Sequence, residues 1–140
     1  ALEIERSFRP ACLRLAIATA FNNDADAAMR ALDRAVELGG EDAGYLEYLA
    51  IARGRLGHRS EAIEAAERLE SPSSGGKAAP PWARARAWAS AGRTDSAVAC
   101  LEEAFQVRSS SMPFLGVTPV FDEIRSCPAV QDLMRRVGVD

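Results

Sequence analysis

The segments NDADAA (residues 23–28), GHRSEA (57–62) and GRTDSA (92–97) are variants of one short sequence, and their spacing decides the fold. From residue 23 to 57 is 34 residues, and from 57 to 92 is 35. Each segment begins with Asn or Gly, which enter the left-handed backbone region at low cost and so end helices. Each ends with Ala, which lets two helices approach closely. A period near 34 residues in a helical sequence is typical of tandem helical hairpins.

Small residues also recur on both sides of these turns, seven positions before and five positions after the turn residue. They are Ala16, Ala50 and Ala85 before the turn, and Ala28, Ala62 and Ala97 after it. Apolar residues at offsets of three, four and seven place one apolar stripe on each helix. The pattern predicts helices at 9–21, 25–38, 43–56, 60–70, 81–91 and 95–107. We expect Asp24 and Thr94 to be the N-caps of the helices that follow them.

The fold predicted from this pattern is all-α, a right-handed superhelical stack of about three antiparallel hairpins over residues 9–112. Residues 1–8 align with residues 35–42, one period later, and we interpret them as the end of a preceding hairpin's second helix. The chain would then be part of a longer array; an ordinary helical turn is the alternative. The polar stretch 71–77 is predicted to be a loop.

Residues 113–140 break the repeat and predict a capping segment. Thr118–Arg125 is expected to form a proline-started turn and short helix, and a second helix is expected from Pro128, ending at Gly138. A terminal repeat needs such an element to cover its apolar edge. The apolar residues expected to do this are Phe114, Phe121, Ile124, Leu133 and Met134.

Composition restricts the class of protein. The 140 residues are 48% hydrophobic, enough for one domain with a core. No apolar run reaches the roughly 18 residues of a membrane helix. The net charge of −3 disfavours nucleic acid or an anionic membrane as the main partner. Three cysteines, Cys12, Cys100 and Cys127, form no Cys-x-x-Cys pair, which favours a reducing, cytoplasmic compartment.

No motif predicts catalysis, a cofactor or a metal. His58 stands alone beside Gly57, without a nucleophile nearby in sequence, and is interpreted as a solvated turn residue. The run Ser74–Lys77 is similar to a phosphate loop, but position 71 is Ser instead of Gly and Ala78 follows the lysine. The acidic residues show neither an EF-hand nor a His-Glu-x-x-His pattern.

The chain resembles tetratricopeptide repeat proteins over about residues 1–108. Its tail is similar to the closing segment of bacterial multi-repeat proteins, Asp-Pro-x-Phe-x-x-Leu-Arg-x-Asp-Pro-x-Phe-x-x-Leu, which stands here as Thr118–Leu133. Such relatives often carry the array behind a winged-helix regulator, an adenylate cyclase or a Ser/Thr kinase domain. The large aromatic residue usual early in each first helix is replaced by Cys12, Leu46 and Pro81.

The resemblance implies a concave groove, lined by the first helices of successive hairpins, that binds an extended peptide or a helix. The residues expected to face it are Leu13, Ile17, Phe21, Tyr48, Ile51, Arg55, Trp82, Arg86 and Ala89. Packing between repeats is the alternative role, above all for Leu13 and Ile17. Arg55 and Arg86 beside aromatic residues favour an acidic or aromatic-bearing peptide. Leu13, Ile17 and Glu47 stand where chaperone-tail clamps carry Lys and Asn, which disfavours that ligand.

The sequence therefore predicts a non-catalytic protein-interaction scaffold, the C-terminal tetratricopeptide module of a longer regulatory or signalling protein. Its partner would be a protein or peptide, with no direct contact to nucleic acid or membrane. The alternative is a self-association or intramolecular docking module that controls an upstream catalytic or DNA-binding domain; self-association would make it a homo-oligomer.

Overall fold

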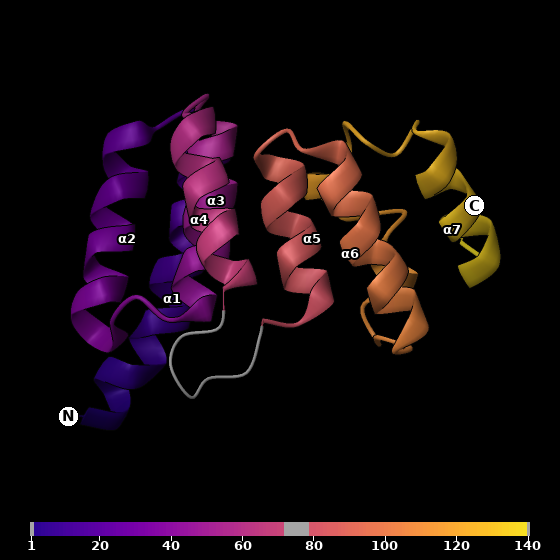
Figure 1. Ribbon diagram of the computed structural model, residues 1–140. Helices are drawn as coiled ribbons and strands as arrows, with labels where there is room; N and C mark the ends of the chain where they lie inside the picture. The colour runs from indigo at the N-terminus through magenta and orange to yellow at the C-terminus, as the bar shows by residue number, and fades with distance from the viewer. Residues whose placement is uncertain (1, 72–78, 140) are drawn as a thin grey trace.

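The computed structural model describes the backbone of residues 2–71 and 79–139, and the side chains of residues 8–71 and 79–139. Within these ranges the chain forms seven α-helices and two 3-10 helices, and no strand (Figure 1). The elements are α1 (Leu2–Phe21), α2 (Ala25–Gly39), α3 (Ala43–Arg55), α4 (Arg59–Glu70), α5 (Pro81–Ser90), α6 (Thr94–Gln106), η1 (Met112–Phe114), η2 (Pro119–Phe121) and α7 (Pro128–Val137). The all-α prediction is confirmed. The loop predicted at 71–77 lies, apart from Ser71, outside the described residues.

The first helix departs from the prediction. The expected boundary between residues 1–8 and a helix at 9–21 is wrong for the described part, because α1 is one helix from Leu2 to Phe21 and contains Pro10. Pro10 removes one helical hydrogen-bond donor. No glycine or asparagine stands between Leu2 and Phe21 to end a helix at that point. The other five predicted helices agree with α2 to α6 within one residue at each end.

The three repeated turns have the same backbone geometry. Asn23, Gly57 and Gly92 have φ angles of 59°, 85° and 80°, all in the left-handed region. In each turn the next residue donates its N–H to the carbonyl five positions back, at 2.9, 2.8 and 3.0 Å. These bonds satisfy the carbonyls that a helix end leaves open. Arg108 (φ 55°) ends α6 in the same way, a fourth copy that the sequence hides because arginine rarely adopts this conformation.

One of the two predicted N-caps is confirmed. The Asp24 carboxylate accepts a hydrogen bond from the Ala27 N–H at 3.1 Å. Thr94 is not an N-cap: it is the first residue of α6, and Arg93 precedes it without a side-chain capping bond.

The helices pack as hairpins, α1 with α2, α3 with α4, and α5 with α6. The first helices also contact one another in order, α1 with α3 and α3 with α5. In Figure 1, α1 and α3 lie behind α2 and α4. All six shared alanines are completely buried, as expected for closely packed helices. The right-handed superhelical path stays a prediction.

The α3 and α5 backbones approach closely at Gly54. A Cβ atom placed on Gly54 would collide with the backbone carbonyl of Ser90. Sequence reasoning did not single out this glycine, because its role depends on a helix 36 positions away.

The tail packs on the last hairpin from two sides. The η2 segment contacts α5, and α7 contacts α6 and η1. Phe121 is completely buried and lies edge-on to Trp82, with ring centroids 5.1 Å apart. The helix predicted from Pro128 to Gly138 is confirmed, and Gly138 is left-handed. Phe114 is 59% exposed, so the expectation that it covers the last hairpin is wrong.

No helix in the described ranges combines the length and apolar character that crossing a membrane requires.

Candidate functional site

A hollow of about 140 Å³ lies where the C-terminal ends of α1, α3 and α5 meet. We call it the inner hollow. The three helices contribute Phe21, Arg55 and Ala89 among other residues, and the start of α4 adds Arg59. The tail closes one side through residues of 119–123. Residues from all three hairpins and from the tail after them therefore line the inner hollow.

Two arginines line the inner hollow, and both side chains are exposed. The Arg55 guanidinium carbon lies 4.6 Å from the centre of the Phe21 ring, within cation–π distance. The Arg59 guanidinium lies beside Gly92, where an added Cβ would be only 2.9 Å from its central carbon. Gly92 thus makes room for this group as well as forming the turn. Neither arginine forms an ion pair with any described residue.

The tail contributes two carboxylates to the lining of the inner hollow. Asp122 is paired with Arg125 at 2.6 Å. Glu123 is exposed and has no ion-pair partner among the described residues. Among the described residues, two positive charges and one negative charge without an ion-pair partner therefore line the inner hollow, and this balance favours an anionic group.

The residues predicted to line one groove are divided by the structure. Phe21, Ile51, Arg55 and Ala89 line the inner hollow, whereas Tyr48, Trp82 and Arg86 do not. Ile51 is 1% exposed, so it is part of the floor instead of a free contact surface.

Of the remaining residues expected to face the groove, Leu13 is buried, Ile17 is half-buried and neither lines the inner hollow. The alternative assignment of Leu13 to packing therefore fits its burial.

Arg86 is engaged inside the protein. It donates a hydrogen bond to Glu47 at 2.5 Å, and its guanidinium carbon lies 5.6 Å from the centre of the Tyr48 ring. Both charged side chains are largely covered, at 20% and 12% exposure. Burial raises the pKa of Glu47 above its ordinary value, and the nearby Arg86 charge only partly opposes this. Arg86 is therefore not available to a ligand as the sequence predicted.

Trp82 is half-buried and is partly covered by the tail. Its ring packs against Phe121, so the chain's own tail occupies part of the surface where the groove was expected. Sequence reasoning also missed Arg59. The only feature of the sequence that could have pointed to Arg59 is its place beside the Gly57 turn, which Arg55 and Arg59 flank.

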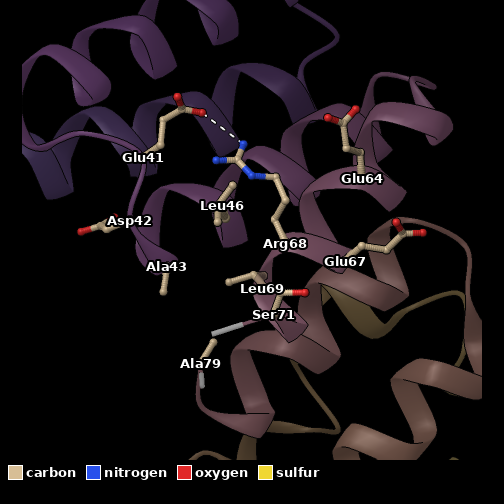
Figure 2. Close-up of a pocket in the computed structure, with 10 residues that line it drawn as sticks. All are labelled: Glu41, Asp42, Ala43, Leu46, Glu64, Glu67, Arg68, Leu69, Ser71 and Ala79. Atoms are coloured by element: carbon tan, nitrogen blue, oxygen red, sulfur yellow. Dashed lines mark hydrogen bonds and ion pairs between the residues drawn. The ribbon is translucent and has the colours of Figure 1, made fainter. Parts of the chain in front are cut away.

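A larger hollow of about 570 Å³ lies between the start of α3 and the end of α4 (Figure 2). Arg68 extends across it from α4 and pairs with Glu41 at 3.2 Å. Four acidic residues line it, Glu41, Asp42, Glu64 and Glu67. Ser71 and Ala79 border it next to residues outside the described ranges, and it carries no functional assignment here.

A polar cluster joins the end of α4 to α5 and α6. Glu70 accepts a hydrogen bond from the Trp88 indole N–H at 2.8 Å, and Arg84 pairs with Glu103 at 2.9 Å. Cys100 lies in the same cluster, and burial, reinforced by the Glu70 charge, raises its pKa to about 12. A thiol with this pKa is protonated at neutral pH and is a poor nucleophile.

Among the residues that the structure describes, no group of three or more His, Cys, Asp or Glu side chains is arranged to hold a metal ion. Comparisons with protein-family models, with curated proteins and with solved structures found no match. They assign no family.

Proposed function

We propose that this protein is a non-catalytic interaction module of the tetratricopeptide type, and that its inner hollow binds a segment of a partner protein. The observation that carries the proposal is that the guanidinium groups of Arg55 and Arg59 lie at one hollow, with no ion pair to any described residue, and that Phe21 supports Arg55. We further propose a cytoplasmic location and a regulatory or signalling role.

The repeat geometry supports the tetratricopeptide assignment. The left-handed turn residues recur after 34 and 35 residues and have the same hydrogen bonds. Alanines at matching positions are buried in all three hairpins. A repeat array of this type buries its core between neighbours and leaves the surface along the first helices for binding.

The inner hollow supports binding over catalysis by the kind of side chains it holds. Arg55 and Arg59 can recognise an anion, but a guanidinium has no accessible neutral form and so cannot act as a general base. The Phe21 contact holds Arg55 before any ligand arrives, which lowers the entropy lost on binding.

Selection from a library of displayed random peptides tests this function. We expect enriched peptides to bind the purified wild-type protein and to lose binding to Arg55→Glu. Arg30→Glu, an equal charge change on the exposed side of α2, is the matched control and should leave binding intact. Absence of enriched peptides, or equal losses in both variants, would reject the inner hollow as a binding surface.

Self-association is the second candidate function, and two side chains on α1 favour it. Phe8 and Leu15 are 58% and 53% exposed and lie two helical turns apart. Pairing of this face with a second copy of the chain would bury both residues. Sedimentation velocity of wild type and of Phe8→Ser/Leu15→Ser tests this: a concentration-dependent dimer only in wild type supports it, and a monomer at all concentrations rejects it.

A further inference from the structure

We infer that the inner hollow is a subsite for one acidic side chain, an internal Asp or Glu of an extended partner peptide. This inference rests on the proposed function and specifies its ligand. It depends on the geometry of two guanidinium groups, the charge balance of the walls and the size of the hollow.

The Arg55 guanidinium is placed before a ligand binds, and the Arg59 guanidinium lies at the same hollow. The Phe21 ring supports Arg55 on one side, and the missing side chain of Gly92 leaves room for Arg59. A guanidinium offers planar, paired N–H donors that match the two oxygens of a carboxylate. Two such groups at one hollow provide more donors than one carboxylate can use, so at least one can bind in a bidentate manner.

The two arginines of the inner hollow favour an anion, whereas the carboxylate of Glu123 opposes its binding. Arg125 neutralises Asp122, whereas Glu123 has no ion-pair partner in the described part of the chain. Glu123 therefore repels an incoming carboxylate weakly, because exposed charges are screened by solvent and salt. Removing its charge should strengthen binding.

The size and floor of the hollow limit the ligand to one side chain. A volume of about 140 Å³ is comparable to a single side chain. Ile51 and Ala89, 1% and 7% exposed, form an apolar floor. Apolar surroundings strengthen a charge-assisted hydrogen bond.

A purely structural role is the competing explanation for Arg55. It is the last residue of α3, where a positive charge stabilises the helix dipole. That role predicts an effect of substitution on stability and none on the preference for acidic peptides, so peptide preference separates the two explanations.

The probe is a fluorescent, acetylated and amidated peptide with three Phe-Glu pairs separated by Ser and Ala, compared with its Phe-Gln counterpart by anisotropy. We expect wild type to bind the Glu peptide at least about tenfold more tightly, as for a close charge pair. Arg55→Gln/Arg59→Gln should abolish this preference. Arg30→Gln/Arg34→Gln, which removes two exposed charges from α2, should retain it.

Two further variants test the effect of the Glu123 carboxylate. Glu123→Gln should tighten binding of the Glu peptide about two- to threefold, the size of a weak exposed charge effect. Glu64→Gln, an exposed acid outside the inner hollow, should not change it.

Equal binding of the Glu and Gln peptides to wild type would overturn the inference, as would equal losses in the two double-arginine variants. A Phe-Gln peptide with a free C-terminus that binds more tightly than the amidated Glu peptide would instead assign the hollow to a terminal carboxylate. Library-selected peptides that need Arg55 but show no acidic preference would leave the proposed function standing and reject this inference alone.

Discussion

Ala62 lies in α4, which packs against α3, and has no exposed surface. We expect Ala62→Leu to lower the free energy of unfolding by about 1–3 kcal/mol, because the larger side chain overpacks the contact between the two helices. Urea denaturation followed by circular dichroism measures it. Ala99→Leu, at an exposed position of α6, is the control and should change stability by no more than about 0.5 kcal/mol. An unchanged midpoint for Ala62→Leu would contradict the packing described for this hairpin.

Gly54 has a different role from the glycines of the turns. It lies within α3, where glycine normally destabilises a helix by about 0.5–1 kcal/mol relative to alanine. Gly54→Ala should nevertheless destabilise the protein, since the new Cβ would collide with the Ser90 carbonyl unless α3 and α5 separate.

Gly44→Ala is the matched control for Gly54→Ala in the same helix. A Cβ at Gly44 meets only Asp42, at 3.5 Å, an ordinary contact distance. This variant should stabilise the protein by up to about 1 kcal/mol. Opposite signs in thermal unfolding would support the close approach of α3 and α5, and stabilisation by both substitutions would refute it.

Arg9 connects three helices through one guanidinium. From α1 it donates to the carbonyls of Ala35 and Gly40 at the end of α2, and to the Asp42 carboxylate at 2.6 Å. Asp42 in turn caps α3 by accepting the Tyr45 N–H at 3.0 Å. A positive group at a helix C-terminus and an acidic group at an N-terminus both complement the helix dipoles. The contact therefore fixes where the second hairpin begins relative to the first.

This contact predicts acid sensitivity. Burial alone would raise the pKa of Asp42, but hydrogen bonds from Arg9 and Tyr45 outweigh it and the pKa is lowered. Because the unfolded chain then binds the proton more tightly, the contribution is present above the ordinary Asp pKa of about 3.9 and is lost as pH falls through the lowered folded value. Wild type should lose more stability between about pH 6 and pH 3 than Asp42→Asn, which keeps a capping side chain.

Chemical denaturation at a series of pH values measures this difference. Asp33→Asn, an exposed position on α2 with no ion pair to a described residue, should show the pH dependence of wild type. If Asp42→Asn loses as much stability as wild type over the same range, the Arg9–Asp42 contact is not the source of the acid sensitivity.

The tail becomes part of the folded domain by packing on both helices of the last hairpin. Phe121 is completely buried against Trp82, whereas Phe114 is 59% exposed. Phe121→Ala should therefore lower the free energy of unfolding by about 3–5 kcal/mol, and Phe114→Ala by about 0.5 kcal/mol or less.

Deletion of residues 113–140 extends this test. Leu115, Phe121, Val130 and Leu133 are completely buried in the intact protein, and burial of each is worth about 1.5–3 kcal/mol. The truncated protein should lose helicity or aggregate, as measured by circular dichroism and light scattering. A monomeric truncation as stable as the intact protein would show that the tail is not part of the core.

Much of the fold could be predicted because its determinants are local. The turn residues, the shared alanines and the apolar stripes each depend on neighbours within about two helical turns, and they recur three times. The positions of α2 to α6 and the turn at Asn23 follow from such short-range patterns. The Arg108 turn was missed because arginine gives no local signal for a left-handed conformation.

The amino-acid sequence by itself determined the all-α class, the places of the hairpins and the short helix before Gly138. Only the tertiary structure decided which charged side chains remain available to bind a ligand. Glu47 neutralises Arg86 across 39 residues, and the tail partly covers Trp82. Arg59 takes the place that Arg86 was expected to fill beside Arg55. The physical reason is that an unpaired charge is a property of distances between helices, and side-chain periodicity along one helix contains no information about the helix that will face it.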